Sequence, residues 1–171
     1  DLSPADLVSR GVIQVMEGRH CFEHLTVEEN LMTGAYTRRS SSAEIRRDLD
    51  MVYTYFPRLK ERRKSQAGYT SGGEQQMTAI GRALMSRPET ILLDEPSRGI
   101  DIGAKAEVFR LLAERAKQGL AVIYTTSEVG ECLSIAHRII VMRRGKISAE
   151  FGPDVTKEQI MAASGEALVA H

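Results

Sequence analysis

The 171-residue sequence contains no tryptophan, only two cysteines and no long apolar run. Cys21 and Cys132 stand far apart and form no C-x-x-C pair, which argues against a disulfide scaffold or zinc ribbon and fits a reducing compartment. No stretch approaches the roughly 18 apolar residues of a transmembrane helix, so any membrane role is expected to be peripheral. Basic and acidic residues number 23 each, which disfavours a global field that would attract nucleic acid or anionic lipid.

The remaining composition is that of a globular domain. Hydrophobic residues make up 42% and charged residues 27% of the sequence, which is too apolar for disorder and enough to bury a core. The length suits one domain. The first residue, Asp1, is not a methionine, and we expect the sequence to be a fragment of a longer protein.

Short β-branched or apolar runs alternate with helical patterns along the chain. Capping-box patterns at Thr26 and Ser41 predict two helices, the second ending at Pro57. Strands are predicted at 11–15, 90–94, 120–124 and 138–142, with helices near 72–87, 101–118 and 127–136 between them. Arg144-Gly145 predicts a hairpin turn into 146–151, and Thr156 caps a last helix. The alternation indicates a mostly parallel, covered α/β sheet with an all-helical insertion before Thr90.

Two adjacent carboxylates follow the apolar run Ile91-Leu92-Leu93. Asp94 and Glu95 are therefore expected at the carboxyl end of a parallel strand, where open α/β sheets bind ligands. This is the Walker B arrangement. Asp94 would hold Mg²⁺, and Glu95 would orient or deprotonate the water that attacks a γ-phosphate. A plain strand-terminal Asp-Glu-Pro turn is the alternative.

A Gly-Gly turn precedes that strand by about 20 residues. In the run from Ser71 to Gln76, two glycines at a helix start let backbone N–H groups approach a phosphate. In this position the run resembles the signature motif of ATP-binding cassette (ABC) ATPases. The resemblance implies a P-loop NTPase-like ABC ATPase core, here partial, with a helical subdomain and a C-terminal hairpin and helix.

The resemblance covers nearly the whole chain and has two parts. From Gly11 to about Met85 the motifs look like the ATPase subunits of branched-chain amino acid importers. From about Pro88 onward, the run Leu93 to Lys105 and later motifs look more like the second cassette of monosaccharide importer ATPases. The resemblance therefore leaves the transported solute divided between these two classes.

The family's roles transfer to matching positions only as implications. Ser71, Gly72, Gly73 and Glu74 would contact ATP held mainly by a partner cassette in a head-to-tail dimer. Asp101 matches the D-loop aspartate. Glu17 falls at the Q-loop position, with Gln14 as the alternative if the alignment slips by three. The insertion, about 22–63, would dock on permease coupling helices.

Two departures limit this transfer. No G-x-x-x-x-G-K-[ST] motif occurs in the sequence, so the loop that cradles the β- and γ-phosphates is not among these residues. The family's switch histidine aligns with Ser127, which cannot provide a cationic contact to the γ-phosphate. We therefore expect this chain alone not to hydrolyse ATP.

The resulting hypothesis is a single partial ABC ATPase domain over 1–171. It comprises a helical subdomain at about 20–86, a Walker B half at about 87–151 and a C-terminal helix at 152–171. ATP and Mg²⁺ are the implied ligands.

The implied partners are permease subunits, a second cassette and, indirectly, a periplasmic or extracellular solute-binding protein, with no nucleic acid. The implied location is the cytoplasmic face of the plasma (inner) membrane, as a peripheral protein. A non-hydrolysing module that docks on a permease, or supplies a signature motif in trans, is the alternative.

Two further patterns favour no ligand. The basic run from Arg58 to Lys64 suits a solvated helix face better than a phosphate site. His20, Cys21 and His24 lack a fourth ligand and a recognisable zinc spacing.

Overall fold

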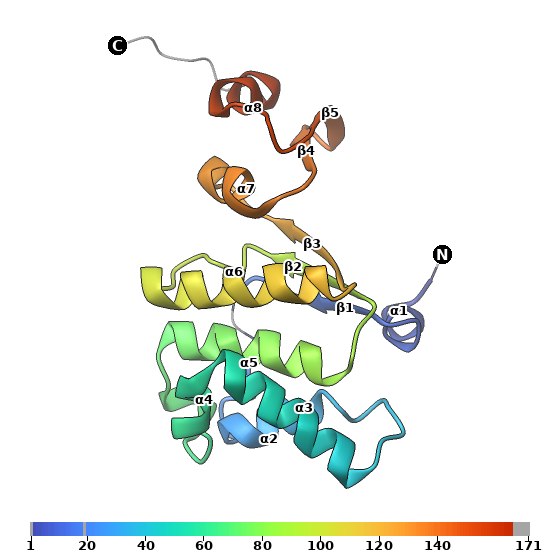
Figure 1. The fold of residues 1–171 in the computed structure, drawn as a ribbon, viewed down its shortest axis with the longest axis vertical. Coiled ribbons are helices and arrows are strands. Elements are labelled where there is room, and N and C mark those ends of the chain that lie inside the picture. Colours follow the sequence, from blue (N-terminus) through green and yellow to red (C-terminus); the bar gives the residue numbers. More distant parts are fainter. Residues whose placement is uncertain (1, 19, 166–171) are drawn as a thin grey trace. The chain divides into compact units, whose positions relative to one another are not determined.

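The computed structural model describes residues 2–18 and 20–165. The chain divides into two compact units, Asp1–Thr125 and Thr126–His171. Figure 1 shows the elements of each unit in sequence colours. In the part of the chain that the structure describes, no helix is long and apolar enough to cross a membrane.

A three-stranded parallel sheet lies in the first unit. Its strands are β1 (Val12–Val15), β2 (Thr90–Asp94) and β3 (Ala121–Thr125), and β2 is the middle strand. Ile91 and Leu93 of β2 are fully buried, as their apolar sequence predicts for a covered strand. The predicted parallel α/β architecture is thus confirmed, and the carboxyl ends of all three strands meet at one edge.

Helices fill the segment between β1 and β2. They are α2 (Val27–Thr33), α3 (Ser42–Tyr55), α4 (Pro57–Glu61), the 3-10 turn η1 (Ala67–Tyr69) and α5 (Gly72–Met85). The capping boxes at Thr26 and Ser41 form as expected, with both reciprocal hydrogen bonds present. Helix α6 (Ile102–Lys117) follows β2 and lies beside α5 (Figure 1).

Helix α1 (Pro4–Ser9) was not predicted, and α4 was expected only as a short helical segment carrying the basic run that begins at Arg58. Helix α1 begins with a capping box between Ser3 and Asp6, a pattern that an aspartate completes in place of glutamate. Pro57 ends α3 and also opens α4 at its first position, where its missing N–H costs nothing.

The second unit contains α7 (Val129–Ile135), β4 (Ile139–Arg143), β5 (Lys146–Phe151) and α8 (Lys157–Ser164). Ile139, Val141 and Ile160 form its small core. Arg144 and Gly145 have φ values of 49° and 76°, which suit the two-residue hairpin turn that the sequence predicted. Residues 166–171 of the expected C-terminal segment lie outside the described residues.

One strand assignment requires a correction. The alternating pattern grouped 138–142 with the strands of the parallel sheet. Among the described residues, however, β4 pairs antiparallel with β5 in a separate two-stranded sheet. The antiparallel pairing itself agrees with the hairpin predicted at Arg144-Gly145, because a two-residue connection joins antiparallel neighbours.

A buried ionic cluster ties the helical segment together. Asp48 on α3 is 9% exposed and accepts hydrogen bonds from Arg38 and Arg87. The Arg87 Nε to Asp48 Oδ2 distance is 3.0 Å. Arg87 also lies 3.5 Å from Glu44. The carboxylate of Asp48 therefore links the α2–α3 loop and the end of α5 to α3.

Replacing Asp48 with alanine should destabilise the fold, because it leaves the buried Arg38 guanidinium without its carboxylate. We expect the free energy of unfolding to fall by about 3 kcal/mol. Urea unfolding followed by circular dichroism measures the loss. Asp50→Ala, on the exposed face two residues later, is the matched control and should change stability by less than about 0.5 kcal/mol. Equal effects of the two substitutions would contradict the structural role of the cluster.

Candidate functional site

The adjacent carboxylates Asp94 and Glu95 stand at the carboxyl end of β2. The hydroxyl of Thr125, at the end of β3, donates to Asp94 Oδ1 at 2.6 Å. The backbone N–H of Glu95 donates to the carbonyl of Thr125 at 3.0 Å. Both acidic residues are partly exposed. The neighbouring strand therefore holds the Asp94 carboxylate and the Glu95 backbone in place while leaving both residues partly exposed.

The backbone of Glu95 has an unusual conformation for a residue with a side chain. Its φ is 44°, in the left-handed region that costs about 1 kcal/mol for such a residue. Its carbonyl accepts from the N–H of Arg98 at 3.1 Å, which closes a turn over the buried Pro96 and Ser97. Strain of this kind is concentrated at functional sites, and here it lies at the turn that directly follows β2.

The signature run opens helix α5. Ser71 is the N-cap, and its Oγ accepts from the N–H of Glu74 at 3.2 Å. The Glu74 carboxylate accepts in turn from the N–H of Ser71 at 2.7 Å and is nearly buried. Its other oxygen lies 4.0 Å from Arg62. In this structure Glu74 thus caps its own helix, and Ser71 and Gly72 are the more exposed members of the run.

Gly73 brings α5 into close contact with the start of α6. A Cβ on Gly73 would lie 2.8 Å from the Cβ of Ala104 and 3.2 Å from a carboxylate oxygen of Asp101. Asp101 is the N-cap of α6 and accepts from the N–H of Ala104 at 3.0 Å. The first turns of α5 and α6 therefore lie side by side, so the predicted signature and D-loop residues are brought together (Figure 1).

The predicted Q-loop residue has a partner near the carboxylates. Glu17 follows β1, and its Oε1 lies 2.6 Å from Arg98 Nη1, in the turn after Glu95. Gln14, the alternative position, lies within β1 and is exposed. Ser127 belongs to the second unit, where it is exposed just before α7.

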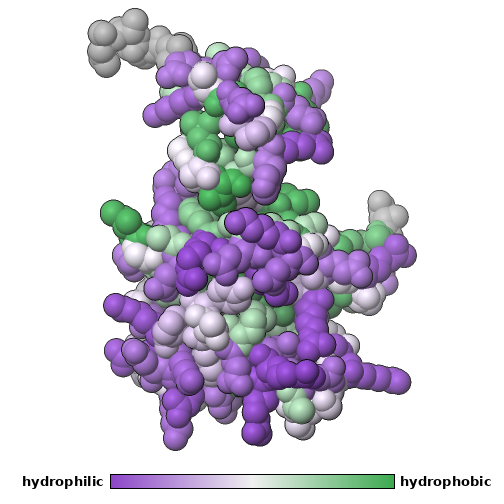
Figure 2. Space-filling model, viewed as in Figure 1, coloured by the Kyte–Doolittle hydropathy of each residue, from purple (hydrophilic) through white to green (hydrophobic). Residues whose placement is uncertain are grey.

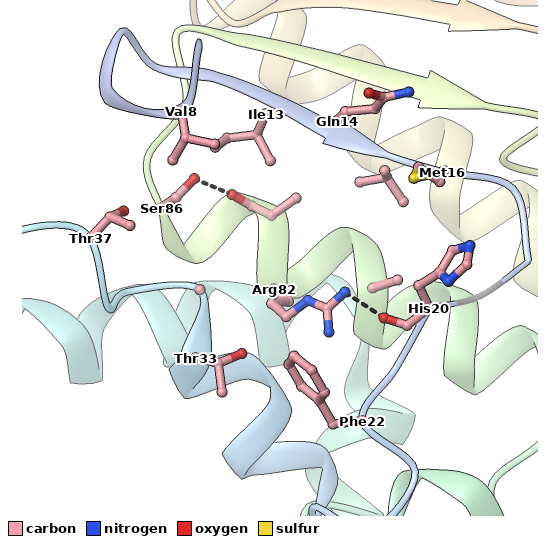
Figure 3. A pocket seen from close by; sticks show the side chains of 14 residues that line it. Val8, Ile13, Gln14, Met16, His20, Phe22, Thr33, Thr37, Arg82 and Ser86 are labelled. Carbon is pink, nitrogen blue, oxygen red and sulfur yellow. Dashed lines mark hydrogen bonds between the residues drawn. The ribbon is translucent and has the colours of Figure 1, made fainter. Parts of the chain in front are cut away.

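A cavity of about 400 Å³ lies in the first unit between β1, α2 and α5. Figure 3 shows Ile13, Thr33, Phe22 and Arg82 around it. Arg82 Nη2 donates to the carbonyl of His20 at 2.5 Å, and its guanidinium carbon lies 5.0 Å from the centre of the Phe22 ring. Met16, Phe22 and Met32 are exposed apolar residues near β1 and α2.

Sequence reasoning missed Thr125, Arg98 and Arg82. The position of Thr125 beside Asp94 could have been predicted, because the carboxyl ends of adjacent parallel strands meet at one edge of the sheet. Arg98 and Arg82 carry no such pattern, since their partners are far away in the sequence and one of those partners is a backbone carbonyl.

Cys21 and Asp94 are the two residues that bear on metal binding. Among the described residues, no three His, Cys, Asp or Glu side chains group so as to hold a metal ion. Burial raises the pKa of the Cys21 thiol to about 11, and that thiol donates to the carbonyl of Gln75 at 3.1 Å, so it is protonated at neutral pH. Asp94 offers a partly exposed carboxylate at the strand end, and carboxylate oxygens are ligands that Mg²⁺ accepts.

Comparison with known proteins gives the same family throughout. The model of the ABC transporter family matches residues 4–98. The chain is 39% identical over 146 residues to the high-affinity branched-chain amino acid transport ATP-binding protein BraG of Pseudomonas aeruginosa. It is also 39% identical over 168 residues to the ribose import ATP-binding protein RbsA of Roseobacter denitrificans. The aligned part is 85% and 93% of this chain, but 62% of BraG and 33% of RbsA.

Solved structures share the fold. A nucleotide-free ATP-binding cassette from an ABC transporter superposes with a TM-score of 0.77 at 23% identity, covering 97% of this chain and 69% of the other. An ATP-binding cassette in its ADP conformation gives the same TM-score at 24% identity and the same coverage. The predicted fold class is confirmed, as is the resemblance to both importer types. By sequence the chain belongs to the ABC transporter family.

Proposed function

We propose that this chain forms part of the ATP-binding subunit of an ABC importer. The juxtaposition of Gly73 with Asp101, beside a strand that ends in Asp94-Glu95, carries the proposal. The importer would act on a small polar solute, either a branched-chain amino acid or a monosaccharide. The subunit would sit at the cytoplasmic face of the plasma membrane as a peripheral protein, as we infer from its similarity to BraG and RbsA.

The end of β2 supplies the chemistry in this proposal. Asp94 would hold Mg²⁺, which when bound neutralises charge on the phosphates. Glu95 would orient the attacking water and accept its proton. Thr125 donates to the Asp94 carboxylate and accepts from the backbone N–H of Glu95. These two hydrogen bonds would fix the Asp94 side chain and the Glu95 backbone before nucleotide arrives, and such preorganisation lowers the cost of reaching the transition state.

The start of α5 would serve the nucleotide of a second cassette. Ser71, Gly72 and Gly73 present backbone N–H groups and the positive end of a 14-residue helix, which favours an anionic phosphate. Glu74 would act by holding Ser71 in its N-cap geometry. Asp101 lies against Gly73. Through this contact it would couple nucleotide binding at the start of α5 to the nucleotide site of its own cassette.

The cavity beside β1 would receive a cytoplasmic segment of the permease. Its exposed apolar lining residues Met16 and Phe22 offer a surface that a helix can bury. The loop after β1 also contains Glu17, whose carboxylate reaches Arg98 next to the Walker B turn. A permease segment bound in this cavity would therefore contact the loop after β1, and the same loop reaches the Asp94-Glu95 turn through the Glu17–Arg98 pair.

The 171-residue chain by itself should bind Mg-ATP no tighter than millimolar, on the order of −4 kcal/mol. The reason is that the phosphate-cradling motif is not among its residues. Isothermal titration calorimetry measures this affinity. A dissociation constant in the micromolar range would show that the residues described above hold nucleotide without that loop.

A chimera tests the proposed function. The part of BraG that aligns with this chain is replaced by this chain, and the remaining BraG segments are expected to carry the family's phosphate loop. Mg²⁺-dependent ATP hydrolysis above that of the isolated 171-residue chain supports the proposal, at a rate below that of BraG because Ser127 stands at the switch-histidine position. A chimera that folds and binds ATP but does not hydrolyse it contradicts the proposal and favours the non-hydrolysing module.

A further inference from the structure

The chain has no net charge, but its charges are distributed unevenly. Five of the seven residues from 58 to 64 are basic, and Glu61 is the only acidic one. All five basic residues are exposed. They form a basic surface on and just after α4, comprising Arg58, Lys60, Arg62, Arg63 and Lys64.

The backbone beneath this basic surface is firmly held. Leu59, between two of its members, is fully buried. The carbonyl of Arg63 accepts from the N–H of Glu28 at 3.0 Å, and that of Ser65 accepts from the N–H of Val27 at 3.0 Å. The start of α2 therefore fixes the segment, and the charged side chains extend from a rigid base.

Ion pairs with other described residues are scarce on this basic surface. Arg62 lies 4.0 Å from Glu74, and Arg63 Nη1 donates to the carbonyl of Lys60 at 3.1 Å. In residues 2–18 and 20–165 no ion pair involves Arg58, Lys60, Arg63 or Lys64. Figure 2 shows a mostly hydrophilic surface over α4. The run thus carries a net positive charge, with Glu61 and Glu74 as its acidic neighbours.

We propose that this basic surface binds an anionic lipid bilayer. Long cationic side chains on a short exposed helix need no shape-matched partner, and each one near an anionic membrane contributes to binding. The run contains no aromatic residue on which a base could stack, which disfavours single-stranded nucleic acid. The membrane contact goes beyond the proposed ATPase function and requires neither nucleotide nor permease.

Vesicle co-flotation of the 171-residue chain tests the proposal. We expect binding to phosphatidylcholine vesicles that contain about 30 mol% phosphatidylglycerol, and loss of that binding in about 0.5 M NaCl. The triple variant Arg58→Glu, Lys60→Glu, Lys64→Glu should bind at least about tenfold more weakly. None of these three side chains takes part in an ion pair among the described residues.

A charge-matched variant separates the basic surface from net charge. Lys117→Glu, Arg144→Glu, Lys146→Glu changes the charge of the chain equally at three exposed residues on other elements, and it should bind like the unmodified chain. Equal binding to purely phosphatidylcholine vesicles, or equal losses in the two triple variants, would overturn the proposal. If the first variant proves unfolded by circular dichroism, Lys60→Glu and Lys64→Glu are measured singly and should each weaken binding.

Discussion

Gly34→Ala should cost at least about 3 kcal/mol of stability, the largest loss expected from any single methyl group in this chain. Gly34 ends α2 where that helix crosses α5. A Cβ at this position would overlap the carbonyl oxygen of Arg82 and lie 2.9 Å from the Cβ of Met85. Because the obstacle is helix backbone, no rotamer change relieves it, and the two helices must separate.

The separation would also disturb the cavity, since Gly34 and Arg82 both line it. Urea unfolding measures the stability. Gly130→Ala, at an exposed glycine in α7 with nothing within 4 Å of its added Cβ, is the control and should raise stability by up to about 1 kcal/mol. Similar stabilities for the Gly34→Ala variant and the unmodified chain would show that α2 and α5 do not pack as closely as described.

Glu95→Gln should slow ATP hydrolysis by the BraG chimera about a hundredfold or more while leaving ATP binding intact. The amide keeps the size and most hydrogen bonds of the side chain but cannot accept the proton of the attacking water. The backbone of Glu95 is held by Thr125 and Arg98, so the substitution should leave the turn unchanged. Steady-state turnover and nucleotide affinity are measured on the same preparation.

Glu89→Gln is the matched control for this substitution. Glu89 precedes β2, at the opposite end of the strand from Glu95, and is exposed. Its turnover should equal that of the unmodified chimera. Unchanged turnover in the Glu95→Gln variant would show that Glu95 is not the catalytic base. Another group would then have to orient the attacking water.

Local patterns were sufficient to predict most elements of this fold. Capping boxes at Thr26, Ser41 and Thr156 marked helix starts that the structure shows, because each box satisfies backbone donors within four residues of sequence. The start of the short helix α4 at Pro57 escaped prediction because a proline is equally compatible with the end of one helix and the start of the next. The hairpin of β4 with β5 was predicted from Arg144-Gly145. Its separation from the parallel sheet was not predicted, because the alternation of strands and helices does not distinguish these two arrangements.

The candidate site was predictable to the extent that it consists of contiguous motifs. Asp94-Glu95 and the run from Ser71 are each readable from neighbours in the sequence. The contact between Gly73 and Asp101, and the pair of Glu17 with Arg98, join residues far apart in the chain. Such pairs depend on how the helices pack, and only the structure supplies them. The roles of the site residues stay predictions until variants are measured.

Mixing two inactive variants of the chimera tests the central claim most directly, namely that the start of α5 serves the nucleotide of a second cassette. One variant carries Gly72→Asp, which places a repelling carboxylate at the first turn of α5. The other carries Glu95→Gln. Each should be nearly inactive alone. If the signature acts in trans, a mixed dimer contains one intact composite site, and co-assembly should restore about a quarter of the original turnover. A mixture no more active than its two components, despite confirmed mixed dimers, would contradict the account.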